Sequence, residues 1–214
     1  MKKICFLLVL LICPFSVFAI DLASNAKSAI IIEPTTGKVI FEKNSNERLE
    51  PASMTKIMTL LLTFEAVDNG RVSLDDTVNI SKRAADMGGS QMFLEAGSNV
   101  RLEEIIKGVS IASANDGAIA LAEFIGGSVE NFVDMMNKKV EDLGLSNTHF
   151  VNPHGLHADN HYSSAYDMAI MASNLISHEK ILHYTSIYED YFNKPDGSRT
   201  WLVNTNKLVR FLEG

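Results

Sequence analysis

Apolar positions recur with a helical period through the middle of the chain, and segments with an extended pattern lie toward both ends. Residues 28–44 hold two β-branched apolar runs separated by a turn rich in proline and glycine, which predicts a β-hairpin. From Ser53 the apolar positions repeat every three or four residues up to Asn69-Gly70, which predicts a helix that ends at a glycine.

The pattern continues as a mostly helical region that ends in extended chain. Further helices are predicted over residues 102–111, 116–124, 129–143 and 164–176. Ser128 and Ser163 are placed to cap the last two of these helices. A short strand is predicted within 76–81, and two extended segments around a Pro-Asp-Gly turn within 185–204. This order predicts an α+β fold, with one sheet assembled from distant segments.

The first residues have the pattern of a secretory signal. Two lysines precede an apolar run, and residues 17–19 are Val-Phe-Ala, where a signal peptidase would cut after Ala19. The run is too short to span a bilayer comfortably, since that takes about 20 residues. We therefore expect residues 1–19 to be a signal peptide and the protein to be exported, to the periplasm or the cell envelope. Cys5 and Cys13 both lie in this leader, so residues 20–214 contain no thiol, disulfide or cysteine metal ligand.

The charge of the chain excludes some partners. The formal net charge is −7, and removal of Lys2 and Lys3 with the leader changes it to −9. An acidic exported protein is a poor ligand for nucleic acid, so no nucleic-acid partner is expected. The remaining residues suffice for one domain or for most of a larger one.

Candidate chemistry begins with a Ser-x-x-Lys pattern. The pattern occurs three times, as Ser24 with Lys27, Ser53 with Lys56, and Ser177 with Lys180. The middle pair alone opens a strongly apolar helix, where residues three apart share a face and the lysine ammonium can reach the serine hydroxyl. Burial would lower the lysine pKa and make it a base near neutral pH. The alternative is that Ser53 caps the helix while Lys56 points to water.

A second polar element lies at residues 113–115, in a tight connection between two apolar helices. As a catalytic element, Ser113 would relay a proton to the leaving group. The Asn115 amide would bridge Lys56 and a substrate carbonyl. The alternative is an ordinary Asn-Asp helix cap.

Five motifs then give the chain a specific resemblance. They are "PASMTKIMT", "GSQMFLEAGSNV", "IASANDGAIALAE", "NPHGL" and "HYSSAYDMA". Their order and approximate spacing are similar to those of the serine D-alanyl-D-alanine carboxypeptidases, the low-molecular-weight penicillin-binding proteins, from about residue 26 to the end. The resemblance implies a β-lactamase/transpeptidase-like fold, a helical cluster against an antiparallel sheet, here incomplete at the C-terminus.

The resemblance also implies site residues and partners. Ser53 would be the acylated nucleophile, Lys56 its base, and Ser113 with Asn115 the second motif, Asn115 binding substrate. The family removes the terminal D-alanine from peptidoglycan stem peptides through an acyl-enzyme, is inhibited by β-lactams, and uses no metal or organic cofactor.

The family's third motif, Lys-Thr-Gly, does not occur in this sequence, which stops at Gly214 just before its expected place. We therefore expect residues 20–214 to be the N-terminal part of a catalytic domain. The later strands, the C-terminal β-domain and the membrane-anchoring helix of the family would be missing, so any contact with a membrane surface would need an anchor that this chain lacks.

The sequence leaves two other interpretations open, a β-lactamase and a noncatalytic remnant, and disfavours a third, a zinc site. His154, His157 and His161 form a run that suggests zinc, although the turn-forming residues around them need not bring them to one face. A β-lactamase would share the serine and lysine. A noncatalytic remnant that only binds cell-wall peptides would share the fold without the chemistry.

Overall fold

The computed structural model describes residues 22–194 and 196–211 of the chain. The predicted signal peptide, with both cysteines, lies outside these residues. Within them the α+β prediction is confirmed, because helices build the centre and short antiparallel strands lie around it.

The predicted helices and strands are found with small shifts at their ends. The strands are β1 (Ala29–Ile32), β2 (Val39–Lys43), β3 (Thr77–Asn79), β4 (Asn99–Arg101), β5 (Glu189–Asn193) and β6 (Arg199–Val203). The α-helices are α1 (Lys56–Asp68), α2 (Lys82–Ala85), α3 (Leu102–Ala112), α4 (Asn115–Gly126), α5 (Val129–Asp142), α6 (Ala165–Ile176) and α7 (Lys180–Thr185). Two 3-10 helices complete the set, η1 (Ala52–Thr55) and η2 (Lys207–Arg210).

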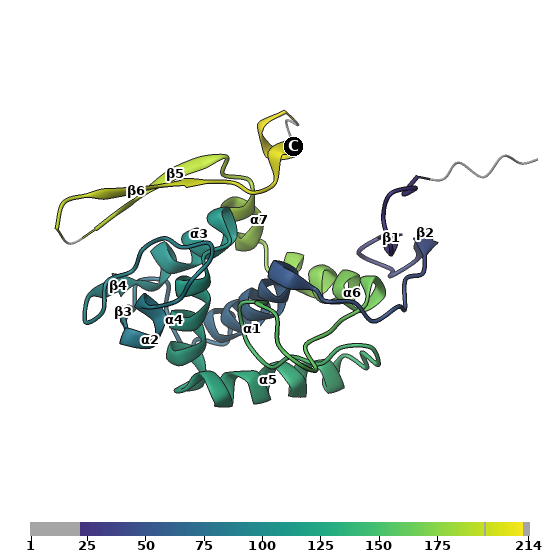
Figure 1. The fold of residues 1–214 in the computed structure, drawn as a ribbon, viewed down its shortest axis with the longest axis horizontal. Coiled ribbons are helices and arrows are strands. Elements are labelled where there is room, and N and C mark those ends of the chain that lie inside the picture. Colours follow the sequence, from purple (N-terminus) through teal and green to yellow (C-terminus); the bar gives the residue numbers. More distant parts are fainter. Residues whose placement is uncertain (1–21, 195, 212–214) are drawn as a thin grey trace, which may run out of the picture.

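The strands do not join into the single sheet that the sequence pattern predicts. In the described part of the chain they form three separate antiparallel pairs, β1–β2, β3–β4 and β5–β6. Figure 1 shows the reason, because β1–β2 and β5–β6 lie at opposite ends of the molecule with the helices between them. The prediction of two hairpins was right, and the prediction of their association was wrong.

Helix α1 forms the centre of the core. Its apolar side chains are buried on nearly all sides, with Met58 and Phe64 0 % exposed. Helices α4, α5 and α6 pack around it. A helix that is apolar all round belongs inside a domain rather than at its surface, which explains why α1 lacks a polar face.

One of the two predicted caps is wrong. Ser128 caps α5 as expected, accepting a hydrogen bond from the Asn131 amide. Helix α6 is instead capped by Ser164, whose hydroxyl accepts from the Asp167 amide at 3.1 Å. Ser163 precedes the cap and pairs its backbone with Leu49. Two adjacent serines offer the same cap chemistry, and the strand-like pairing of the first leaves the second for the helix.

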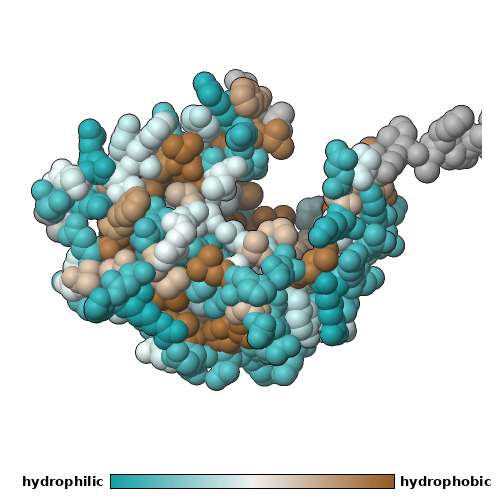
Figure 2. Space-filling view, viewed as in Figure 1, coloured by the Kyte–Doolittle hydropathy of each residue, from teal (hydrophilic) through white to brown (hydrophobic). Residues whose placement is uncertain are grey.

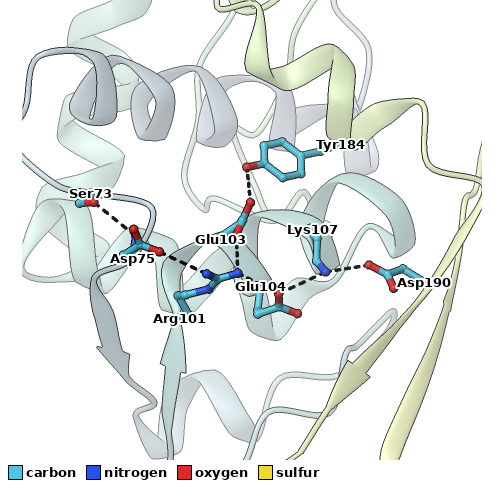
Figure 3. A network of polar contacts seen from close by, with 8 residues as sticks. All are labelled: Ser73, Asp75, Arg101, Glu103, Glu104, Lys107, Tyr184 and Asp190. Carbon is cyan, nitrogen blue, oxygen red and sulfur yellow. Dashed lines mark hydrogen bonds and ion pairs between the residues drawn. The ribbon is translucent and has the colours of Figure 1, made fainter.

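Polar contacts hold α7 and β5 against α3 (Figure 3). The Tyr184 hydroxyl donates to Glu103 Oε1 at 3.0 Å, and Lys107 Nζ donates to Asp190 Oδ2 at 2.7 Å. The side chain of Lys107 is 17 % exposed and that of Asp190 34 %, so this ion pair is better shielded than an ordinary surface pair. Hairpin β5–β6 is therefore fixed in place beside the helix that leads to Ser113.

The surface of the molecule is hollowed on one face. Figure 2 shows a concavity between the side that carries β1–β2 and the side that carries β5–β6. Figure 1, drawn from the same side, shows the start of α1 in the middle of the molecule, between these two ends. Within the residues described, no helix has the length and apolar character needed to cross a membrane.

Candidate active site

Ser53 lies in η1, the 3-10 turn that leads directly into α1. Pro51, which directly precedes η1, is buried, whereas Ser53 is exposed. The hydroxyl of Ser53 makes no cap hydrogen bond, and neither η1 nor α1 has a side-chain cap. The cap alternative is therefore wrong. The turn instead presents the serine hydroxyl at the surface, beside the start of a buried helix.

Lys56, the first residue of α1, is turned inward. Its side chain is 3 % exposed, and its ammonium donates to Ser53 Oγ at 3.3 Å and to His154 O at 2.7 Å. Burial lowers the pKa of Lys56 to about 8, and the negative charge of Asp116 opposes part of that decrease. A substantial share of neutral amine is thus available at mildly alkaline pH, as general-base chemistry requires.

The loop at 152–156 is attached to the same end of α1. Thr59 Oγ1 donates to Pro153 O at 2.6 Å, one turn along the helix from the bond between Lys56 and His154 O. Two consecutive carbonyls of the loop are therefore bound by two side chains on one helix face. This pair of bonds fixes where the Lys56 ammonium lies relative to Ser53.

Gly155 allows this loop to approach η1 closely. Its φ is +87°, in the left-handed region, and a Cβ atom there would overlap the Ala52 carbonyl and lie 2.9 Å from Thr55 Oγ1. A residue with a side chain would meet both a strained backbone conformation and a steric clash. The contact between the 152–156 loop and the serine turn therefore depends on glycine.

We expect Gly155→Ala to lower the free energy of unfolding by about 2–4 kcal/mol, because backbone strain and overlap with a backbone carbonyl add together. Gly144→Ala is the matched control, since Gly144 also has a positive φ, +67°, but a Cβ atom added there would meet nothing within 4 Å beyond its chain neighbours. Comparing the free energies of unfolding of the two variants by chemical denaturation separates the cost of the strained backbone from the cost of the clash. An equal loss in both would show that the clash with Ala52 has no energetic weight.

The element at 113–115 packs against the backbone of residues 88–90, which precede β4. The Asn115 amide nitrogen Nδ2 donates to Gly88 O at 2.8 Å, and its backbone N–H donates to Ser90 O at 2.7 Å. In the described part of the chain, no hydrogen bond joins Asn115 to Lys56. The predicted bridge would use Asn115 Oδ1 as the acceptor from the Lys56 ammonium, and the bond from Nδ2 to Gly88 O does not exclude it, so the bridge stays a prediction.

Ser113 ends α3 in the left-handed conformation, with φ 56° and ψ 39°. Its side chain is half-buried, and among the described residues it makes no hydrogen bond to Ser53 or Lys56. Left-handed backbone is uncommon for a residue other than glycine and is concentrated at functional sites and turns. The structure therefore gives Ser113 an unusual conformation, while its role in proton relay stays a prediction.

The histidine run separates into buried and exposed members. His161 donates its Nε2 proton to Thr55 Oγ1 at 2.8 Å, since its Nδ1 accepts from the Val151 amide. His157 is exposed and lies 2.9 Å from Glu50. The residues that the structure describes contain no group of three or more His, Cys, Asp or Glu side chains arranged to hold a metal ion.

Two residues near Lys56 were missed by sequence reasoning. His154 contributes a backbone carbonyl, which has no side-chain signal, although the motif "NPHGL" marked the segment. Its ring is neutral, because burial and the charge of Lys56 lower the pKa of His154 to about 4. The sequence pattern assigns Asp116 only to a helix cap, yet this residue is 0 % exposed and its charge acts on Lys56. The sequence signal that could have marked Asp116 was its position directly after Asn115.

The arrangement has the parts needed for acyl transfer at a serine. An exposed hydroxyl lies within hydrogen-bond distance of a buried amine with a lowered pKa. The neighbouring His154 ring is neutral, so the pKa of the amine is lowered by burial and not by a second cation.

Comparison with known proteins gives consistent matches along nearly the whole chain. Residues 17–213 match the model of the D-alanyl-D-alanine carboxypeptidase family, peptidase S11. The chain is 56 % identical over 194 residues to D-alanyl-D-alanine carboxypeptidase DacF of Bacillus subtilis, covering 91 % of this chain and 50 % of that protein. It is 40 % identical to DacA of Escherichia coli K12, covering 86 % of this chain and 46 % of the relative. The chain thus spans about half the length of the curated relatives it matches.

Solved structures agree with the fold. Penicillin binding protein 5 from Haemophilus influenzae superimposes with a TM-score of 0.81 at 35 % identity, covering 87 % of this chain and 54 % of that one. The implied β-lactamase/transpeptidase-like fold is therefore confirmed for the part that the two share. Because the family model covers more than nine-tenths of the residues, the chain belongs to the D-alanyl-D-alanine carboxypeptidase family.

Proposed function

We propose that this chain carries the acylation chemistry of a serine-type D-alanyl-D-alanine carboxypeptidase, with Ser53 as nucleophile and Lys56 as its base. The observation that carries the proposal is the buried Lys56 ammonium at 3.3 Å from an exposed Ser53 hydroxyl. The relatives' names support the reaction class, since both DacF and DacA are D-alanyl-D-alanine carboxypeptidases.

The proposed reaction proceeds in two steps. Neutral Lys56 removes the proton of Ser53 as the oxygen attacks the carbonyl carbon of the penultimate D-alanine. The C–N bond to the terminal D-alanine then breaks, and its nitrogen takes a proton that Ser113 relays from Lys56. Water hydrolyses the resulting ester and releases the shortened peptide and free Ser53. In this proposal Asn115 would orient the substrate amide.

The substrate proposed for this site is the stem peptide of peptidoglycan, with β-lactams as inhibitors that acylate the same serine. A cell-wall substrate agrees with the predicted export of the chain to the periplasm or cell envelope. The carboxypeptidase names of the relatives favour neither a β-lactamase nor a noncatalytic wall-binding remnant.

A penicillin labelling experiment tests the proposal. The purified chain is incubated with benzylpenicillin, its intact mass is measured, and the modified peptide is located by tandem mass spectrometry. One adduct of the mass of the drug, on the peptide containing Ser53, is the expected result. An unmodified chain, or an adduct elsewhere, would contradict it. Turnover of a chromogenic cephalosporin without a lasting adduct would favour a β-lactamase.

The rate of this acylation is expected to rise with pH and to level off above about pH 9. Only neutral Lys56 can accept the proton, and with a pKa of about 8 roughly a tenth of it is neutral at pH 7, so the rate rises about tenfold to the plateau. His154, with a pKa of about 4, stays neutral throughout. Acylation rates from pH 6 to 10 give the profile. A rate still climbing at pH 10 would mean that Lys56 titrates like an exposed lysine.

A further inference from the structure

Four hydrogen bonds attach residues 88–94, which we call the 88–94 loop, to the start of α4. Asn115 contributes two of them, to the Gly88 and Ser90 carbonyls. Asp116 accepts the other two, from the Met92 amide at Oδ1, 3.1 Å, and from the Leu94 amide at Oδ2, 3.0 Å. The side chains of Asn115 and Asp116 therefore both bind the loop, and Asp116 does so with both carboxylate oxygens.

The Asp116 carboxylate fixes an unusual conformation in the loop. Its two acceptor bonds lie on either side of Phe93, which has a φ of 62° and whose side chain is 55 % exposed. A bulky residue at positive φ is strained and persists where its surroundings over-determine it. Here the surroundings are the two bonds from Met92 and Leu94 to one carboxylate.

The same carboxylate acts on Lys56. Asp116 is 0 % exposed, and within the described residues it forms no ion pair at contact distance. The Lys56 ammonium is hydrogen-bonded to Ser53 Oγ from η1 and to the His154 carbonyl from the 152–156 loop, and the Asp116 carboxylate from α4 acts on it through its charge. Asp116 is the one that carries a negative charge, and this charge stabilises the ammonium form of Lys56.

We propose that Asp116 is a positioning residue that couples the 88–94 loop to the Ser53–Lys56 pair. One carboxylate holds the loop backbone and interacts electrostatically with the base, so a change at either place alters the other. The role rests on the proposed function, because it matters for catalysis through Lys56 as the base. The carboxylate itself touches neither Ser53 nor the reacting atoms.

The test compares Asp116→Asn with the matched control Asp167→Asn. Asp167 is also buried in the first turn of a helix and accepts from the Asn147 amide and the Thr148 hydroxyl, but its charge does not act on Lys56. The Lys56 side chain is titrated by carbon-13 NMR of its ε-carbon. We expect Asp116→Asn to shift the Lys56 pKa downward, because the stabilising charge is gone, and Asp167→Asn to leave it unchanged.

A second readout follows the loop itself. Amide hydrogen exchange at Met92 and Leu94 is expected to accelerate at least about tenfold in Asp116→Asn, because an amide nitrogen cannot accept one of the two bonds. The control variant leaves these two amides protected. Faster exchange together with an unchanged Lys56 titration would overturn the coupling and leave Asp116 with a purely structural role.

If Asp116→Asn does not fold, the coupling between Asp116 and Lys56 is measured in the unsubstituted chain. The carboxyl carbon of Asp116 then shifts near the pH at which Lys56 titrates, and this inflection disappears in Lys56→Met. Absence of the inflection in the unsubstituted chain would overturn the proposal. None of these measurements needs a substrate, so a chain that shows the coupling but takes no penicillin would contradict the proposed function alone.

Discussion

Ser53→Ala is expected to abolish covalent labelling of the chain by benzylpenicillin. The substitution removes the oxygen that would form the ester and leaves the Lys56 ammonium with the His154 carbonyl as its acceptor. Intact mass spectrometry at a large excess of drug measures the effect directly. Because Ser53 is exposed and caps no helix, the thermal unfolding of the variant should match that of the unsubstituted chain, which separates lost chemistry from lost folding.

The other two Ser-x-x-Lys serines supply matched controls. Ser24 is exposed near the start of the described chain, and Ser177 donates its hydroxyl to Asn174 O at 2.7 Å at the end of α6. We expect Ser24→Ala and Ser177→Ala to be labelled as fully as the unsubstituted chain. Labelling of Ser53→Ala that equals theirs would refute the assignment of the nucleophile.

Lys56→Met is expected to slow the acylation of Ser53 by about a thousandfold, which is the middle of the range for loss of a general base. Methionine has a similar length and fills the buried space, so the variant keeps the packing at the start of α1. The second-order rate constant for penicillin acylation measures the effect. The loss should be greatest above pH 8, where the unsubstituted chain has most of its Lys56 neutral.

Lys180→Met is the control for this substitution, since Lys180 is exposed at the start of α7 in the third Ser-x-x-Lys pattern. Its acylation rate should equal that of the unsubstituted chain. A Lys56→Met rate within about threefold of this control would mean that another group activates Ser53, because such a difference is below what a general base contributes.

The long helices could be predicted because they carry many apolar positions at one period. The helix predicted over 129–143 is observed as Val129–Asp142, and the one predicted over 102–111 as Leu102–Ala112. Helices α2 and α7 were not predicted, since four and six residues are too few to show a period. Strand pairing between hairpins was predicted wrongly, because a strand pattern does not identify its partner.

The site was predictable where it depends on side chains at fixed spacing in one helix. The proximity of Lys56 to Ser53 follows from their three-residue separation at the start of α1. The partners of Asn115 were not predictable, because they are the Gly88 and Ser90 carbonyls, and every residue carries a carbonyl. The two roles of Asp116, binding the 88–94 loop and acting on Lys56 through its charge, could not be predicted either. They depend on the geometry of the loop, which no local sequence pattern encodes.

The requirement for glycine at position 155 constrains how this site can diverge. The constraint comes from backbone meeting backbone beside Ala52, so it holds whichever acyl donor is bound. The next two side chains, Leu156 and His157, are exposed and have no such restriction. Substitutions at 155 are therefore selected against through folding, whereas substitutions at 156 and 157 meet no comparable clash with the backbone of Ala52.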